Sequence, residues 1–347
     1  MKLLKFVNVN GEKFEIQNNF LDLGLLDIND ISEIVHFDQI EVKHLELSSN
    51  NISKIQGLDH LEGLEILNLS SNTINELSGL DRLENLEILH VASNQITEIH
   101  GLQNLSKLKE LYLRGNQIQK LGGLENLHNL KKLDLSWNLI EDIKGLDSLE
   151  SLEVLWIAGN KIKKISGLKN LKNLSVLNLA GNRITEIIGI NQLENLKELY
   201  LNDNEIQKIQ NLDALKNLET LWITSNKITE IEGLENCIKL EVLNLKSNQI
   251  DEIKGLYSLT NLNKLFLSEN DIELIKGLET LQNLETLDLS DNRISKITGL
   301  ESLMKLKDLW IGGNEIVQDL LDTLGGIDSG GCALDPLKFV QYCLVNL

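Results

Sequence analysis

Apolar residues recur along this chain at a fixed interval of twenty-two positions. Thirteen asparagines mark the interval, from Asn50 to Asn314, with no insertion or deletion between them. Each Asn has a Leu five residues before it, a Leu, Ile or Val three residues before it, and an Ile two residues after it. A period of this length indicates supersecondary units that bury their apolar sides against their neighbours. The chain is therefore predicted to be a solenoid rather than a globule.

The residues that precede each Asn alternate between apolar and polar, as at Leu45 and Leu47. Alternation predicts a short strand with one buried face, and identical crossovers between strands predict a parallel sheet. The Asn that follows can both donate and accept hydrogen bonds. We therefore expect the asparagines to form a buried ladder that satisfies backbone groups, and to be scaffold rather than a binding site.

The second half of each repeat predicts a thin outer side. A Gly stands seven residues after the Asn in eleven of the first twelve repeats, and Asn211 replaces it in the other one. This choice indicates a left-handed backbone. Leucines then follow at intervals of three, as at Leu58, Leu61 and Leu64, which favours 3₁₀ turns over an α-helix. The predicted fold is an α/β solenoid, a right-handed horseshoe with a concave parallel sheet and convex 3₁₀ turns.

The two ends depart from the repeat and predict caps. Residues 1–43 are expected to form an N-terminal cap, with a hairpin at Asn10-Gly11 and a degenerate repeat at 21–43. Thirteen repeats then occupy 44–319, and 320–347 are expected to form a C-terminal cap. There, Asp335-Pro336 predicts a helix start with an N-cap. The helix would cover the last rung, or serve as a partner-binding tail, with an apolar side made of Leu337, Val340, Leu344 and Leu347.

The positions four residues before each Asn, here named the concave column, carry most of the aromatic residues. Eight aromatics lie between residues 44 and 319, and six of them are in this column: Tyr112, Trp156, Tyr200, Trp222, Phe266 and Trp310. Alternation points these side chains away from the core. They could simply pack on one another across an exposed sheet. We favour a protein-recognition surface, because Trp and Tyr dominate interface hot spots and because charged residues are interleaved, as at Arg114, Asp134 and Asp288.

One local patch of this surface is expected to be hollow. Trp156 has small residues beside it, among them Ala158 in its own repeat and Ala180 in the next one. Two adjacent rungs with small residues next to a Trp predict a shallow depression that accepts a partner side chain.

Composition narrows the classes of partner and the compartment. The net charge of −19 argues against nucleic acid, and no apolar run reaches the length of a membrane span. Three cysteines are an odd number without metal-site or disulfide-framework spacing, and the N-terminal stretch is too polar for a secretory signal. We expect a cytoplasmic protein that is monomeric alone.

No group of residues indicates catalysis. The glycines follow the repeat and form no phosphate-binding loop. The two concave histidines, His44 and His90, are two rungs apart, or about 9.6 Å, which is too far for one zinc ion to bridge. We therefore expect no enzymatic activity, no cofactor and no metal.

The repeat resembles the SDS22-like class of leucine-rich repeats over about residues 21–319. The resemblance implies a regulatory subunit of a protein phosphatase, which binds the catalytic subunit through concave aromatic and acidic residues. The positions that match by column are Tyr112, Asp134, Trp156, Tyr200, Trp222, Phe266 and Trp310. Two features depart from that class: its C-terminal cap motif with a Tyr-Arg pair is missing after Asn314, and the concave charges are of both signs.

Bacterial internalins also share the period of twenty-two, but they are secreted and usually carry Pro where this chain has Gly. The sequence therefore favours a non-enzymatic adaptor that binds another protein through its concave face. A phosphatase regulatory subunit and an internalin-like adhesin are the alternatives.

Overall fold

The computed structural model describes residues 3–346 and divides into two compact units. The first unit runs to residue 162 and includes 166–174, and the second consists of 163–165 and the chain from 175 onward. Elements of the first unit are β1 (Phe6–Val9), β2 (Glu12–Glu15), β3 (Phe20–Asp22), the 3₁₀ helices η1 (Ile31–Glu33) and η2 (Phe37–Gln39), β4 (His44–Glu46), β5 (Ile66–Asn68), β6 (Ile88–His90), β7 (Glu110–Tyr112), β8 (Lys132–Asp134) and β9 (Val154–Trp156). Those of the second are β10 (Val176–Asn178), β11 (Glu198–Tyr200), β12 (Thr220–Trp222), β13 (Val242–Asn244), β14 (Lys264–Phe266), β15 (Thr286–Asp288), β16 (Asp308–Trp310), α1 (Gln318–Thr323) and α2 (Pro336–Val345).

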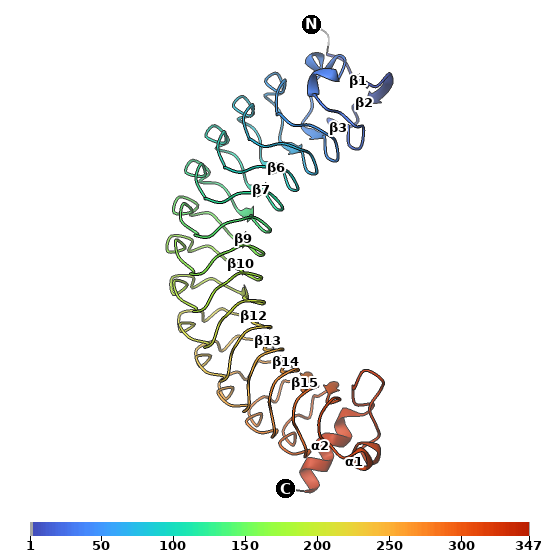
Figure 1. Cartoon of the computed structure of the whole chain (residues 1–347), viewed down its shortest axis with the longest axis vertical. Helices are drawn as coiled ribbons and strands as arrows, with labels where there is room; N and C mark the ends of the chain where they lie inside the picture. Colours follow the sequence, from blue (N-terminus) through green and yellow to red (C-terminus); the bar gives the residue numbers. More distant parts are fainter. Residues whose placement is uncertain (1–2, 347) are drawn as a thin grey trace. The chain divides into compact units, whose positions relative to one another are not determined.

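Each unit contains a parallel sheet whose strands follow one another in chain order, β3 to β9 in the first and β10 to β16 in the second. Strands pair with the next one at a shift of one repeat, so that Leu111 lies opposite Leu133 and Leu199 opposite Leu221. The middle residue of every strand in the two sheets is buried. Within each unit the strands line the inner side of a curved stack of coils (Figure 1). The predicted solenoid with a parallel sheet is confirmed.

The Asn ladder ties each coil to the one before it. In the second unit the Asn226 Nδ2 donates to the carbonyl of Leu201 in the preceding coil at 3.0 Å. Its Oδ1 accepts the backbone N–H of Ile206 at 3.0 Å, and the side chain is 8% exposed. The same bonds recur in other repeats, so both halves of the amide satisfy buried backbone groups. The prediction that these residues are scaffold is confirmed.

The outer side is built from single turns, as the leucine spacing predicted. Backbone hydrogen bonds join residues three apart, from the N–H of Leu61 to the carbonyl of Leu58 and from Leu64 to Leu61. The glycines that precede these turns have a positive φ, and Asn211 adopts the same conformation with φ of 61°. A Cβ at Gly123 would lie 2.0 Å from the carbonyl oxygen of Ile99, so close coil packing adds a second reason for Gly.

Both ends carry the predicted elements, with differences at the C-terminus. Strands β1 and β2 form the antiparallel hairpin around Asn10-Gly11, and β3 adds a strand before the first regular repeat. Helix α2 starts at Pro336, but the Asp335 side chain makes no capping hydrogen bond.

The predicted apolar side of α2 is wrong in part. Val340 is buried as expected, but its buried neighbours are Phe339 and Cys343, whereas Leu337 and Leu344 are 39% and 44% exposed. Leu347 lies outside the described residues. The sequence also gave no indication of α1, a helix of six residues.

Candidate functional site

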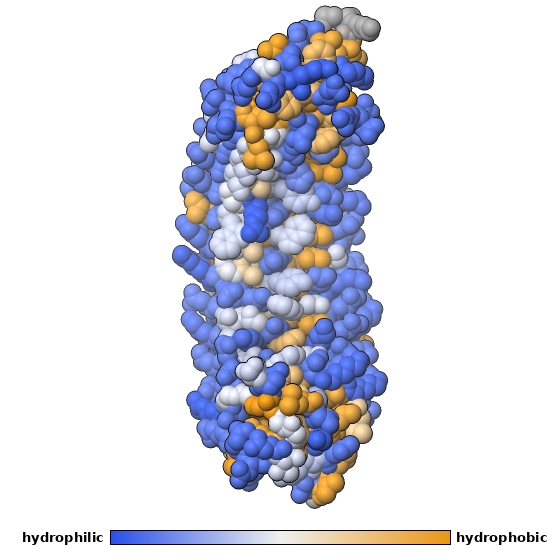
Figure 2. Space-filling view, turned by 90° about the vertical axis from the view of Figure 1, so that its right-hand side faces the viewer, coloured by the Kyte–Doolittle hydropathy of each residue, from blue (hydrophilic) through white to orange (hydrophobic). Residues whose placement is uncertain are grey.

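Every residue of the concave column that was singled out from the sequence is the last residue of its strand. In the first unit these are Tyr112, Asp134 and Trp156, and in the second Tyr200, Trp222, Phe266, Asp288 and Trp310. All are half-buried, because each side chain packs against the neighbouring rungs and leaves one side open. Figure 2 shows the sheet face, where pale residues of near-neutral hydropathy lie between hydrophilic ones.

In the first unit a network of rings and charges holds Tyr112. The ring of His90 stacks on it with centroids 4.5 Å apart and planes inclined by 3°. The Tyr112 hydroxyl donates to Glu110 Oε2 at 2.6 Å, and Glu110 forms an ion pair with Lys132 at 3.0 Å. Burial, followed by Glu110, raises the pKa of Tyr112, so the phenol stays a neutral hydrogen-bond donor. The ring is thereby held by the His90 stack on one face and by the hydrogen bond of its hydroxyl.

The same arrangement occurs in the second unit. The Tyr200 hydroxyl donates to Glu198 Oε2 at 2.7 Å, two residues earlier on β11. Burial, followed by this carboxylate, raises the pKa of Tyr200 to about 12. Its ring meets that of Trp222 edge-on at 6.1 Å and 60°. A Glu two residues before a Tyr therefore orients the phenol in both units.

The two column aspartates have a local structural role that the sequence analysis did not foresee. Asp134 Oδ1 accepts the backbone N–H of Ser136 at 2.9 Å, and Asp288 Oδ1 accepts that of Ser290 at 3.0 Å. Asn68 makes the equivalent bond to Ser70. An Asp or Asn in the column thus closes the turn that follows the strand.

At the C-terminal end of the column the chain covers its own sheet edge. Trp310 pairs with Cys332 in an isolated antiparallel bridge, and the N–H of Ala333 donates to the carbonyl of Leu309 at 2.7 Å. The strand edge beyond Trp310 is therefore occupied, so this residue marks the end of the open column.

Comparison with known proteins identifies the repeat. The family model described as "Leucine Rich repeats (2 copies)" matches residues 84–121, 106–148, 150–193, 194–236 and 282–325, and the model described as "Leucine rich repeat" matches residues 40–96. Together they cover more than half of the chain. The chain belongs to the leucine-rich repeat family. A comparison with curated protein sequences gives no significant match.

Several solved leucine-rich repeat structures are similar to this one. An internalin, InlF, from Listeria monocytogenes has 33% sequence identity and a TM-score of 0.63, covering 74% of this chain and 83% of that one. A leucine-rich repeat protein from Leptospira interrogans has 25% identity and a TM-score of 0.69, covering 88% and 92%. The ectodomain of the plant receptor kinase GASSHO1/SCHENGEN3 from Arabidopsis thaliana, in complex with CASPARIAN STRIP INTEGRITY FACTOR 2, has 28% identity and a TM-score of 0.63. That match covers 79% of this chain and 36% of the receptor.

One turn of the first unit departs from the leucine-rich repeat frame on the sheet side. Trp137 stands just before the ladder residue Asn138, at a position with positive φ that elsewhere carries Gly, Ser, Asp or Glu. It is 60% exposed, and the guanidinium carbon of Arg114 lies 5.9 Å from its ring. A Cβ on Gly159 would be 2.9 Å from Trp137 Cδ2, so the indole lies directly over this glycine.

This contact bears on the depression expected beside Trp156. The surface of Gly159 is covered by the Trp137 indole and is not open. Ala158 belongs to the first unit and Ala180 to the second, and both are half-buried. A hollow that joins them stays a prediction.

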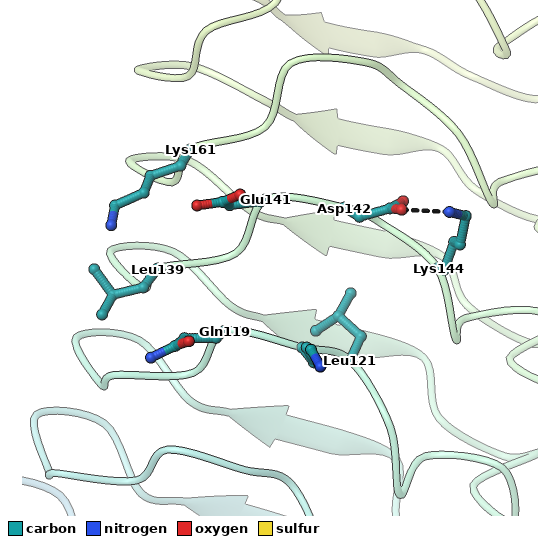
Figure 3. A pocket seen from close by; sticks show the side chains of 8 residues that line it. Gln119, Leu121, Leu139, Glu141, Asp142, Lys144 and Lys161 are labelled. Atoms are coloured by element: carbon teal, nitrogen blue, oxygen red, sulfur yellow. Dashed lines mark ion pairs between the residues drawn. The ribbon is translucent and has the colours of Figure 1, made fainter.

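The same turn borders a pocket of about 530 Å³ on the flank of the first unit. Its lining residues are Gln119, Lys120, Leu121, Leu139, Glu141, Asp142, Lys144 and Lys161 (Figure 3). Leu139 is the only aliphatic residue at the position that follows the Asn, and Gly122, next to the pocket-lining Leu121, is the only Gly six residues after an Asn. These two departures from the leucine-rich repeat frame were the available sequence signal for the pocket.

Among residues 3–346, no three His, Cys, Asp or Glu side chains are grouped so that they could hold a metal ion. The described helices are also too short and too polar to cross a bilayer. Leucine-rich repeat domains are commonly protein-binding modules.

Proposed function

We propose that this leucine-rich repeat protein is a non-enzymatic adaptor that holds a partner protein on its concave column. One observation carries the proposal: six of the eight aromatics between residues 44 and 319 occupy a single position of the repeat. That position lies on the sheet face, where every ring is half-buried and presents one side to solvent. Large rings fixed on a rigid sheet are typical anchors of protein interfaces.

The contacts around the two tyrosines support this function. Tyr112 and Tyr200 are each held by a hydrogen bond to a Glu on the same strand, at 2.6 and 2.7 Å. Side chains that are already ordered lose less entropy when a partner binds. Charges of both signs on this face, such as Lys264 and Asp288, then fix the orientation of the partner.

The competing explanation is that the rings serve only to stabilise the sheet through contacts across rungs. Two variants distinguish the binding explanation from the stabilising one: Trp156→Ala in the first unit and Trp222→Ala in the second. Partners are first identified by affinity purification from native lysate with mass spectrometry, and affinity is then measured with the purified partner. We expect each change to weaken binding about tenfold or more while thermal stability changes little.

A matched control is Tyr257→Ala, which removes an aromatic that is 64% exposed and lies outside the column. It should leave binding unchanged. If the column variants bind the partner as well as the wild type does, the adaptor function through this face is wrong.

A phosphatase regulatory subunit is a finer version of this proposal. It is supported by the neighbouring positions of Tyr112, Asp134 and Trp156 on β7, β8 and β9, an aromatic and acidic group like that of the SDS22-like class. This version requires a phosphatase catalytic subunit to be the main protein that co-purifies with the wild type. Loss of that subunit with Trp156→Ala would tie it to the column.

The similarity to InlF supports a second candidate, an adhesin that binds a protein outside the cell. We favour a cytoplasmic location, because the chain has three cysteines and all are free. Cell fractionation distinguishes the two: recovery of the native protein in the cytoplasmic fraction supports the adaptor, and recovery outside the cell supports the adhesin.

A further inference from the structure

The turn Ser136-Trp137-Asn138-Leu139 carries two large apolar side chains that the fold does not require. Trp137 occupies a left-handed position, with φ of 58°, where the neighbouring repeats have Gly115 and Gly159. A bulky residue with positive φ is a strained choice that glycine would avoid. Strain kept at an exposed position indicates a role in function rather than in stability.

Leu139 is the second unexplained residue. At the equivalent position the preceding repeat has Gln117 and the following one has Lys161. Leu139 is half-buried and forms, together with Leu121, the apolar part of the flank pocket. Beside it, an added Cβ at Gly122 would meet nothing within 4 Å, so the space over this part of the coil is open. The pocket is thus formed by replacements in two successive repeats.

Charges around this turn differ in sign from the chain as a whole. Arg114 is exposed beside the Trp137 ring, and Lys120 and Lys161 line the pocket. Among the described residues, these three cations have no ion pair within 4.0 Å. On the other side of the pocket Asp142 is neutralised by Lys144 at 2.6 Å, which leaves Glu141 as the one acidic side chain of the lining without an ion pair (Figure 3). The edge is therefore locally positive on a chain whose net charge is −19.

We infer that this edge, made of Arg114, Trp137, Leu139 and the flank pocket, is a second binding site, separate from the concave column. Its ligand is an extended acidic peptide segment of a partner protein. One apolar side chain of the segment enters the pocket over Leu121 and Leu139, and the backbone crosses the turn against the Trp137 indole. Carboxylates of the segment pair with Arg114, Lys120 and Lys161, because these three cations of the edge form no ion pair among the described residues. The inference goes beyond the adaptor function and holds whether or not the column binds a protein.

The test uses the full chain and three sets of synthetic nine-residue peptides. Each peptide has Leu or Phe at its centre, and the flanks are Glu-Ser, Ser-Gly or Lys-Ser in mixed order. Binding is followed by fluorescence anisotropy at low salt. We expect the acidic set to bind at least about tenfold more tightly than the basic set, with an affinity that falls as salt is added.

Two variants replace a residue of this turn by the residue that an adjacent repeat has at the same position. Trp137→Gly and Leu139→Gln should each weaken binding of the acidic peptides about tenfold. Trp137→Gly should leave the melting temperature unchanged or raise it, because glycine relieves the left-handed strain. A residue with a purely structural role would instead lower the melting temperature. Lys161→Gln should make the affinity for the acidic peptides less dependent on salt.

The control is Leu274→Gln, which removes an exposed leucine from the second unit and should not affect binding. The inference is wrong if no acidic peptide binds more tightly than about 1 mM, if the basic set binds equally well, or if both turn variants bind like the wild type. It is also wrong if sedimentation shows that the wild type dimerises and Trp137→Gly does not, since the occupant would then be a second copy of the chain. Trp156→Ala and Trp222→Ala should bind the acidic peptides normally, so failure of the adaptor proposal and failure of this one are distinguishable.

Discussion

The imidazole of His90 lies flat against the phenol ring of Tyr112, with centroids 4.5 Å apart and planes inclined by 3°. The contact joins two neighbouring strands of the sheet face, β6 and β7. It places a group that titrates near neutral pH inside the aromatic column. Burial lowers the pKa of His90 and outweighs the opposing effect of Glu110 and Glu46.

This shift predicts that acid destabilises the first unit through His90. A His whose pKa is lower in the folded state than in the unfolded state binds fewer protons when folded. Its contribution to stability is complete above the unfolded pKa of about 6.5 and is lost as the pH falls through that value toward the folded pKa. We therefore expect the free energy of unfolding to fall more for the wild type than for His90→Asn between about pH 7.5 and about pH 5.5.

Urea denaturation at a series of pH values measures the difference. His128→Asn, which changes an exposed histidine on the outer side, is the control and should follow the wild type. If the free energy of unfolding changed with pH in the same way for the wild type and His90→Asn, burial of this ring would not be the cause of the loss of stability in acid.

Removing one ladder amide should have a large effect on stability. Asn226→Ala leaves the N–H of Ile206 in the coil interior without its partner, and it removes one of the two donors to the carbonyl of Leu201, which keeps its bond from Asn204 Nδ2. An orphaned buried donor costs about 1–3 kcal/mol and the lost bonds to carbonyls add to this, so we expect a loss of about 3 kcal/mol in the free energy of unfolding. The matched control is Asn217→Ala, which removes a bond to the carbonyl of Glu194 on the outer side and should cost less than about 1 kcal/mol. Equal losses in chemical denaturation would contradict the ladder as the main polar support of the coils.

The glycine that precedes the outer turns gives a third prediction. Gly123→Ala should lower the free energy of unfolding by about 2 kcal/mol or more, because its φ is +74° and its Cβ would clash with the carbonyl oxygen of Ile99. Asn211→Gly should be nearly neutral: the left-handed residue becomes unstrained, while the bond from its Nδ2 to the carbonyl of Ile187 at 2.7 Å is lost. Gly63→Ala is the control, since nothing lies within 4 Å of its added Cβ. The expectation fails if Gly123→Ala and Gly63→Ala melt at the same temperature.

The sequence was sufficient for the sheet and the coils, because the fold repeats one set of buried contacts. The Leu five residues before Asn226 and the Ile two residues after it each occupy a fixed position in the coil, and the same two positions recur in every repeat. Side-chain bonds such as that from Tyr200 to Glu198 were not predicted. They depend on rotamers and distances across a strand, which the repeat pattern does not encode.

Prediction was also weaker where the repeat ends. Pro336 correctly indicated the start of α2, since proline suits the first turn of a helix. The buried side of that helix is set by what it packs against, so Phe339 and Cys343 face inward in place of Leu337 and Leu344. Trp137 lies outside the concave column, and neither its left-handed backbone nor its high exposure was predicted.

The three cysteines should react with thiol reagents in an order set by burial. Cys237 is fully buried, and burial raises its pKa to about 12, so the reactive thiolate is scarce and shielded. Cys343 is 4% exposed on the terminal helix α2, and Cys332 is half-buried beside Trp310. In the native protein at neutral pH we expect iodoacetamide to modify Cys332 first, Cys343 more slowly as α2 opens, and Cys237 only when its coil unfolds. Peptide mapping by mass spectrometry over time gives the three rates, and Cys332→Ser should leave the other two unchanged. If Cys237 reacted as fast as Cys332, the coil around Leu212 and Leu240 would not be the closed interior that the structure shows.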